Sequence, residues 1–141
     1  PMSSQPQSGL PPSQSVPIRL TARDLARLDA LLASPTYRHH PGAASLQREL
    51  DRADVLAPDA DAAGIVGMNA HVDCVDEHDG SRHTLTLVYP HEADAGAGRV
   101  SVLAPVGAAL LGLAVGQRID WPGVNGRTLR LRVLAVAPPA A

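Results

Sequence analysis

Residues 99–121 read RVSVLAPVGAALLGLAVGQRIDW. The alternation over residues 99–103 predicts a short strand, and Pro105 suits the first turn of a helix that ends at Gly112. Residues 118–121 predict the next strand. This stretch therefore predicts two strands that are joined through one short helix.

Strands are also expected on both sides of this stretch. Their residues are 65–75, 84–89 and 128–137. Asp79 and Gly80 offer a hairpin turn between the first two, and the turn PGVNG (122–126) precedes the last. In that last strand apolar residues alternate with Arg130 and Arg132, so we expect one buried face and one cationic face.

The residues before the sheet predict a pair of helices. Thr21 followed by Asp24 fits a capping box, and leucines recur at helical spacing until Pro35. A second amphipathic helix fits residues 43 to about 55. Because the link PTYRHHPG (35–42) is short, the two helices should pack as an antiparallel hairpin.

The order of these elements predicts an α+β protein. A helical hairpin over residues 18–57 precedes a mostly antiparallel sheet domain over residues 62–137. Residues 1–17 contain five Pro, five Ser and no charge, a composition typical of a disordered tail. No apolar run approaches the roughly 18 residues of a membrane span, and the N-terminal residues lack a signal-peptide pattern, so we expect a cytoplasmic protein.

The composition restricts the function. The chain has 141 residues, of which 45% are hydrophobic, but its aromatic side chains are only Tyr37, Tyr89 and Trp121. This shortage argues against aromatic cages and base-stacking platforms. The formal net charge of −2 gives the whole chain no attraction to nucleic-acid phosphates, and the single cysteine, Cys74, excludes an internal disulfide.

The sequence contains no catalytic or metal-binding motif that we recognise. The histidines and the cysteine around the first sheet hairpin match no zinc spacing, and strand alternation separates His71 and Asp73 from Cys74. Cys74 lies within an expected strand, where cysteine packs as a small hydrophobic residue more often than it acts as a nucleophile. Gly-Ala-Gly at 96–98 does not continue into a phosphate-binding motif. We therefore expect a binding protein with no metal and no other cofactor.

Charged residues are unevenly distributed along the sequence. Acidic residues cluster over 49–61 and 73–79, whereas residues 99–132 hold five Arg and one Asp. This distribution predicts a molecule that is acidic toward its helices and basic along its last strands. Two interpretations stay open: an ordinary solvated surface, or a charge arrangement that orients the protein on a large partner.

Residues 99–121 also resemble a known family. Their Ser, Pro and Gly, followed by Ala-Leu-Leu-Gly, Val-Gly and a closing strand, resemble the C-terminal signature of bacterial transcript-cleavage factors of the Gre type. With TLVYPHEAD (86–94) and ELDRA (49–53), the chain is more similar still to the Rnk family, the regulators of nucleoside diphosphate kinase. The resemblance covers residues 18–137. It implies a helical hairpin, a short coiled coil, joined to an FKBP-like domain.

The resemblance implies RNA polymerase as the partner. Members of the family dock their C-terminal domain at the rim of the polymerase secondary channel, with the hairpin pointing inward. The docking surface implied for this chain includes Ser101, Leu103, Pro105 and Gly107, and Leu103 replaces an acidic residue of the family. The oligomeric state stays open, because the apolar stripe of the short hairpin could be covered internally or by a second copy, and we favour a monomer.

The expected hairpin tip departs from that of the cleavage factors. Those factors carry acidic residues there, whose carboxylate oxygens help to hold a catalytic Mg²⁺. The tip here contains Tyr37, Arg38, His39 and His40 but no Asp or Glu, and each helix spans only about 20 Å. We therefore expect a non-catalytic regulator that competes with Gre-type factors, does not stimulate transcript cleavage, and affects nucleoside diphosphate kinase through transcription.

Three other functions stay open. An FKBP-like domain could act as a peptidyl-prolyl isomerase with Trp121 as one wall of its pocket, although a fold alone does not establish an activity. The chain could instead bind and modulate nucleoside diphosphate kinase directly. Direct DNA or RNA binding has the least support, because the chain lacks net positive charge and stacking aromatic residues.

Overall fold

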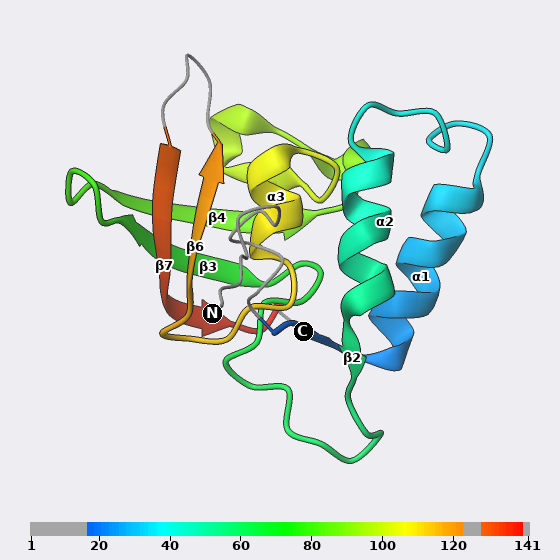
Figure 1. Cartoon of the computed structure of the whole chain (residues 1–141), viewed down its shortest axis with the longest axis horizontal. Coiled ribbons are helices and arrows are strands. Elements are labelled where there is room, and N and C mark those ends of the chain that lie inside the picture. Colours follow the sequence, from blue (N-terminus) through cyan, green and yellow to red (C-terminus); the bar gives the residue numbers. More distant parts are fainter. Residues whose placement is uncertain (1–16, 123–127, 140–141) are drawn as a thin grey trace, which may run out of the picture.

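The computed structural model describes residues 17–122 and 128–139. A pair of helices stands beside a curled sheet, so the predicted α+β class is confirmed (Figure 1). All but the last residue of the predicted disordered tail, and all but the first residue of the PGVNG turn, lie outside the described residues. No described helix has the length and apolar character needed to cross a membrane.

The N-terminal part is a helical hairpin whose two ends are joined by a pair of short strands. Its elements are β1 (Arg19–Leu20), α1 (Ala22–Ala33), α2 (Ala43–Arg52) and β2 (Asp54–Val55). The second helix is shorter than predicted, because the chain after Arg52 pairs with β1 in parallel. The Leu56 N–H donates to the Leu20 carbonyl at 2.8 Å, which closes the base of the hairpin.

The cap of α1 follows the prediction only in part. The Thr21 hydroxyl oxygen accepts a hydrogen bond from the Asp24 N–H at 3.1 Å, as expected for an N-cap. The Asp24 carboxylate does not reach back to complete a capping box. It accepts the Met68 N–H at 3.1 Å instead, and this bond ties the first turn of α1 to the chain that leads into the sheet.

The sheet has five strands in the order β5-β4-β3-β7-β6. In chain order they are β3 (His71–Asp76), β4 (Arg82–Val88), β5 (Arg99–Ser101), β6 (Arg118–Pro122) and β7 (Thr128–Ala137). All neighbours are antiparallel except β4 and β5, which are parallel. The predicted β3–β4 hairpin turn is present, with Gly80 in the left-handed region at φ 78°.

Three details of the sheet differ from the sequence predictions. The strand expected from residue 65 begins only at His71, and Ile65 makes an isolated bridge to Ala114. The expected loop over residues 91–98 contains two short 3₁₀ turns, η3 (Pro90–Glu92) and η4 (Ala95–Ala97). The helix expected to end at Gly112 is the shorter α3 (Pro105–Leu110), which follows β5.

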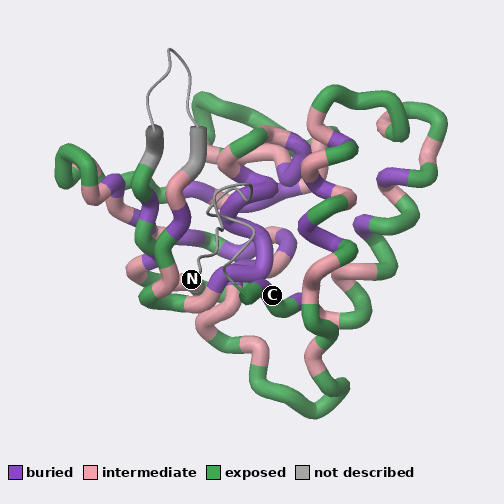
Figure 2. Tube along the Cα trace, viewed as in Figure 1, coloured by how far each residue is buried: buried purple, intermediate pink, exposed green. Residues whose placement is uncertain are grey.

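One buried core runs through the hairpin and the sheet. Leu28 and Leu46 from the hairpin belong to the same cluster as Val72, Leu87 and Leu110 from the sheet and α3, and all five are 0% exposed. The buried segments face inward from both parts of the molecule (Figure 2). The hairpin therefore shares one core with the sheet, and its helix α2 packs against α3.

Candidate protein-docking site

The turn between β5 and α3, residues 101–105, is held by its own hydrogen bonds. The Ser101 hydroxyl oxygen accepts the Leu103 N–H at 3.0 Å, and the Ser101 carbonyl accepts the Ala104 N–H at 3.0 Å. Pro105 then occupies the first turn of α3, where its missing N–H is not needed. The turn is thus ordered without any partner.

Of the four turn residues expected to contact a partner, two reach the surface and two are buried. Pro105 is exposed and Ser101 is partly exposed. Leu103 is only 2% exposed and packs into the core. Gly107 is buried, and a Cβ there would overlap the Ser101 carbonyl oxygen, so glycine lets α3 pack closely on β5. Leu103 and Gly107 therefore shape the turn, while Ser101 and Pro105 form its surface.

The hairpin tip, residues 34–42, is a series of tight turns. The Arg38 N–H donates to the Ser34 carbonyl at 2.9 Å, and the His40 N–H donates to the Tyr37 carbonyl at 2.9 Å. Tyr37 is partly buried and packs against the core, whereas Arg38, His39 and His40 are exposed. The four predicted tip residues thus lie together, three of them facing solvent.

The tip touches the β5–α3 turn, a contact that the sequence pattern did not predict. A Cβ on Gly42 would overlap the Leu103 carbonyl oxygen, so the two backbones are in direct contact. The Gly42 N–H also donates to Nδ1 of His40 at 2.8 Å, which holds the imidazole beside this contact. The Pro and Gly residues within 35–42 predict a loop at this position. They do not show where that loop packs.

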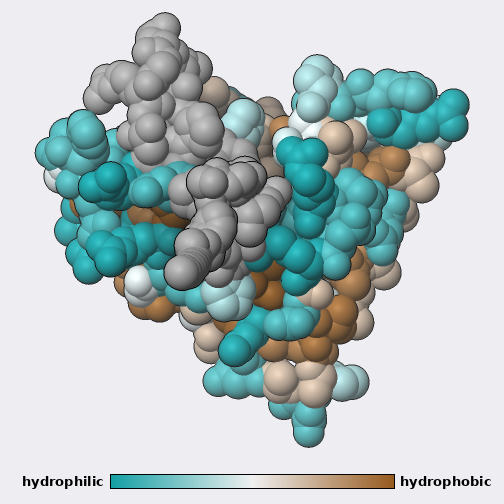
Figure 3. Space-filling view, in the orientation of Figure 1, coloured by the Kyte–Doolittle hydropathy of each residue, from teal (hydrophilic) through white to brown (hydrophobic). Residues whose placement is uncertain are grey.

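The arginines of the last strands are not a separate basic region. Glu77, from the β3–β4 turn, lies 3.3 Å from Arg118 and 3.4 Å from Arg132, and Arg130 lies 3.3 Å from Asp120. The predicted division into an acidic half and an arginine half is therefore wrong for these strands. Glu77 on the β3–β4 turn and Arg132 on β7 place both signs of charge side by side, and the surface over this turn is hydrophilic (Figure 3).

The acidic group on the return helix is also smaller at the surface than its sequence indicates. Glu49 is 5% exposed, and its carboxylate pairs with Arg52 at 2.8 Å. A buried, paired carboxylate contributes little to the field outside the molecule. The negative surface charge near α2 therefore comes from the exposed Asp51 and Asp54, and the exposed Arg48 adds a positive charge to the same helix.

The cysteine and the histidine of β3 have ordinary structural surroundings. Cys74 is 1% exposed, and burial, with smaller contributions from Asp73 and Asp76, raises the pKa of its thiol. His71 lies on the face of β3 opposite to Cys74, as the alternation predicted. Its Nδ1 atom lies 2.9 Å from the Thr86 hydroxyl oxygen. Within residues 17–122 and 128–139, no three His, Cys, Asp or Glu side chains form a group that could hold a metal ion.

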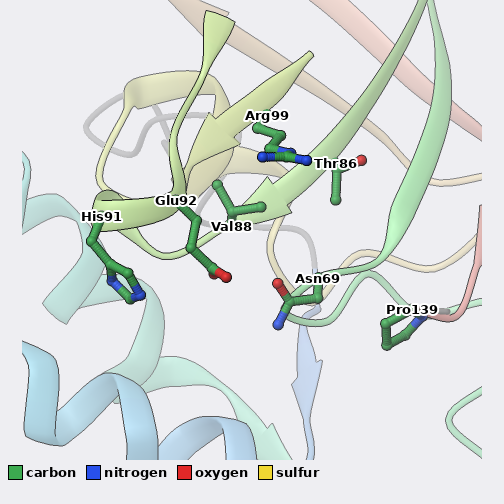
Figure 4. Close-up of a pocket in the computed structure, with 7 residues that line it drawn as sticks. All are labelled: Asn69, Thr86, Val88, His91, Glu92, Arg99 and Pro139. Atoms are coloured by element: carbon green, nitrogen blue, oxygen red, sulfur yellow. The ribbon is translucent and has the colours of Figure 1, made fainter. Parts of the chain in front are cut away.

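A polar pocket of about 690 Å³ lies at the end of β4 (Figure 4). It is lined by Asn69, Thr86, Val88, His91, Glu92, Arg99 and Pro139. Tyr89, which directly follows β4, is not among the described lining residues, and the Trp121 side chain lies outside the described part. The described lining of this pocket therefore contains no apolar aromatic wall of the kind that the isomerase alternative requires.

Comparison with known proteins places this geometry in a family. The family model for the C-terminal domain of the transcription elongation factors GreA and GreB matches residues 61–138, and the model for the Rnk N-terminus matches residues 17–56. The regulator of nucleoside diphosphate kinase from Escherichia coli K12 is 42% identical over 111 residues, which cover 79% of this chain and 82% of that protein. The chain belongs to the Rnk group of the GreA/GreB family.

Members of the GreA/GreB family also provide the structural match. A solved GreA/GreB elongation factor from Nitrosomonas europaea is 39% identical, with a TM-score of 0.69, and the match covers 86% of this chain and 98% of that one. GreA from Acidiphilium cryptum is 34% identical over 83 residues, which cover 59% of this chain and 53% of GreA. These relatives of the Rnk-type chain are named as regulators and elongation factors rather than as enzymes.

Proposed function

We propose that this chain binds RNA polymerase at the rim of its secondary channel and competes there with Gre-type factors. Membership of the family supports the partner, and the ordered β5–α3 turn with its exposed Pro105 is the observation that carries the proposal. The proposal includes an FKBP-like sheet domain, a hairpin that acts as a short coiled-coil arm, and binding as a cytoplasmic monomer.

The hairpin supports a regulator that does not stimulate transcript cleavage. Its helices have 12 and 10 residues, which correspond to about 18 Å and 15 Å. Mg²⁺ prefers oxygen ligands, and residues 34–42 contain no Asp or Glu. The Arg38 guanidinium would repel a cation, and neutral imidazoles are poor ligands for Mg²⁺. The arm is thus both short and chemically unsuited to hold a catalytic metal.

A binding assay with purified core RNA polymerase tests the proposal. We expect the labelled chain to bind the core enzyme at micromolar concentration and GreA to displace it. Pro105→Asp should weaken binding at least tenfold, because it places a charge on the exposed docking turn. Pro58→Asp, the same change in the exposed loop between β2 and β3, is the matched control and should bind like the wild type. No complex at low salt would refute the proposal.

The absence of cleavage stimulation needs a separate assay. Halted transcription complexes that have backtracked are incubated with the chain, with GreA, or with both. We expect no cleavage product from the chain alone, and a loss of GreA-dependent product as the chain is added. Cleavage by the chain alone would show that the tip acts in the active site despite its composition.

The name of the E. coli relative supports a second candidate function, direct binding to nucleoside diphosphate kinase. In this case the chain would change the activity of the purified kinase in the absence of polymerase. Co-purification from lysate distinguishes the two functions, because polymerase subunits support the first and the kinase supports the second.

A further inference from the structure

Resting on the proposed function, we infer that the hairpin tip and the β5–α3 turn form one continuous docking surface. In this arrangement Arg38, His39 and His40 contact an acidic protein segment of the polymerase rim that lies next to the segment contacted by Pro105. The tip then contributes affinity at the rim, and no part of the arm needs to extend into the channel.

The contact between the two backbones places the tip at the turn. The Cα of Gly42 lies against the carbonyl of Leu103, which is two residues before Pro105. Helices α2 and α3 also pack against each other. The β5–α3 segment lies beside the end of α2 that carries the tip (Figure 1). A partner that covers Pro105 therefore meets the tip immediately beside it.

The relative positions of the tip and the turn are fixed. The tip is ordered by its own hydrogen bonds, by the 2.8 Å bond from the Gly42 N–H to His40, and by the packing of Tyr37 on the core. The turn is ordered by Ser101 and by the close packing of α3 on β5. A surface that is already ordered loses little conformational entropy when it binds.

The charge of the tip indicates the chemistry of its partner. Arg38, His39 and His40 are exposed, and no acidic residue occurs between Ser34 and Gly42. Among the described residues, Arg38 forms no ion pair. An unpaired guanidinium on an ordered surface favours a carboxylate partner, with which it can form two parallel hydrogen bonds.

An acidic protein segment fits this surface better than nucleic acid does. The chain as a whole carries a formal charge of −2, so a polyanion is not attracted over long distances. The only aromatic residue of the tip, Tyr37, is partly buried against the core and offers no stacking platform to a base. The tip carries an exposed arginine and the turn that it contacts carries an exposed proline, which is the mixed composition found at protein interfaces.

The test compares, in the full chain, a charge reversal in the hairpin tip with one in the first turn of α1. Arg38→Glu changes the tip, and Arg23→Glu makes the same change on an exposed residue in the first turn of α1. Affinity for core polymerase free of nucleic acid is measured for both variants, together with Pro105→Asp, at about 0.1 M and 0.5 M salt. Circular dichroism melting confirms that each variant is folded.

We expect Arg38→Glu to weaken binding about tenfold at the lower salt concentration and less at the higher one, because screening reduces charge effects. Arg23→Glu should stay within about twofold of the wild type. Wild-type affinity of Arg38→Glu beside a weakened Pro105→Asp would overturn this inference and leave the proposed function standing. Failure of the wild type to bind would remove both. Arg38-dependent binding of a single-stranded oligonucleotide with similar affinity would assign the tip to nucleic acid and also overturn the inference.

Discussion

Gly107→Ala has two opposing effects on the free energy of unfolding at one buried position. Alanine is favoured over glycine in a helix interior by about 1 kcal/mol, so helix propensity alone predicts a more stable protein. The new methyl group would overlap the Ser101 carbonyl oxygen, however, and a backbone atom in a sheet cannot move aside as a flexible side chain can. Overpacking of this kind costs about 1–3 kcal/mol, and a backbone obstacle places it near the upper limit.

We therefore expect Gly107→Ala to lower the free energy of unfolding by about 2 kcal/mol. At about 4 °C per kcal/mol, the melting temperature should fall by about 8 °C. Urea unfolding followed by circular dichroism gives the free energy, and a thermal melt gives the temperature.

The matched control for this prediction is Gly96→Ala. The nearest atom to a Cβ at Gly96 is Oδ1 of Asp94 at 3.5 Å, an ordinary contact, so stability should change by no more than about 0.5 kcal/mol. A Gly107→Ala protein as stable as the wild type, with the control also unchanged, would refute the close approach of α3 to β5.

Three further changes test other contacts of the fold. Asp24→Ala removes the acceptor of the Met68 N–H and should cost about 1–2 kcal/mol in urea unfolding, and an unchanged midpoint would show that this bond does not hold the hairpin to the sheet. Glu77→Gln removes a carboxylate shared by two half-exposed arginines, so it should cost less than about 1 kcal/mol at low salt and nothing measurable at 1 M salt. Cys74 should react with a thiol reagent at pH 8 at least tenfold more slowly in the native protein than in urea, because burial blocks access and raises its pKa; equal rates would place the thiol at the surface.

The elements with strong local signals were predictable from sequence. Thr21 as the N-cap of α1, Pro105 at the start of α3 and Gly80 in the β3–β4 turn each occupy the position that their backbone chemistry favours. The strand β7 was predicted over the same residues, because arginines and apolar residues alternate along it.

The contacts between distant segments were not predictable in this way. The pairing of β1 with β2 ended α2 at Arg52, although the amphipathic pattern continues beyond it. The second half of the expected capping box was lost because the Asp24 carboxylate found a donor 44 residues away. Both outcomes depend on tertiary structure, and local propensity carries no information about it.

The candidate site shows the same limit. Family resemblance indicated Ser101, Leu103, Pro105 and Gly107 together, but a linear motif does not tell exposed positions from buried ones. In the structure Leu103 is 2% exposed, so the residues that carry the family resemblance include a core position as well as exposed ones.

The β1–β2 pair sets a rule for how an arm of this type can change in length. The strand before α1 pairs with the strand after α2, so the base of the hairpin is closed. Residues added to one helix alone would therefore shift the β1–β2 pairing or distort the tip. Growth of the arm needs equal insertions on both sides of residues 34–42. Seven residues in each helix would carry the tip about 10 Å past the β5–α3 turn and break the contact between Gly42 and Leu103. Insertion length alone could thus convert a tip that binds beside the turn into one that reaches beyond it.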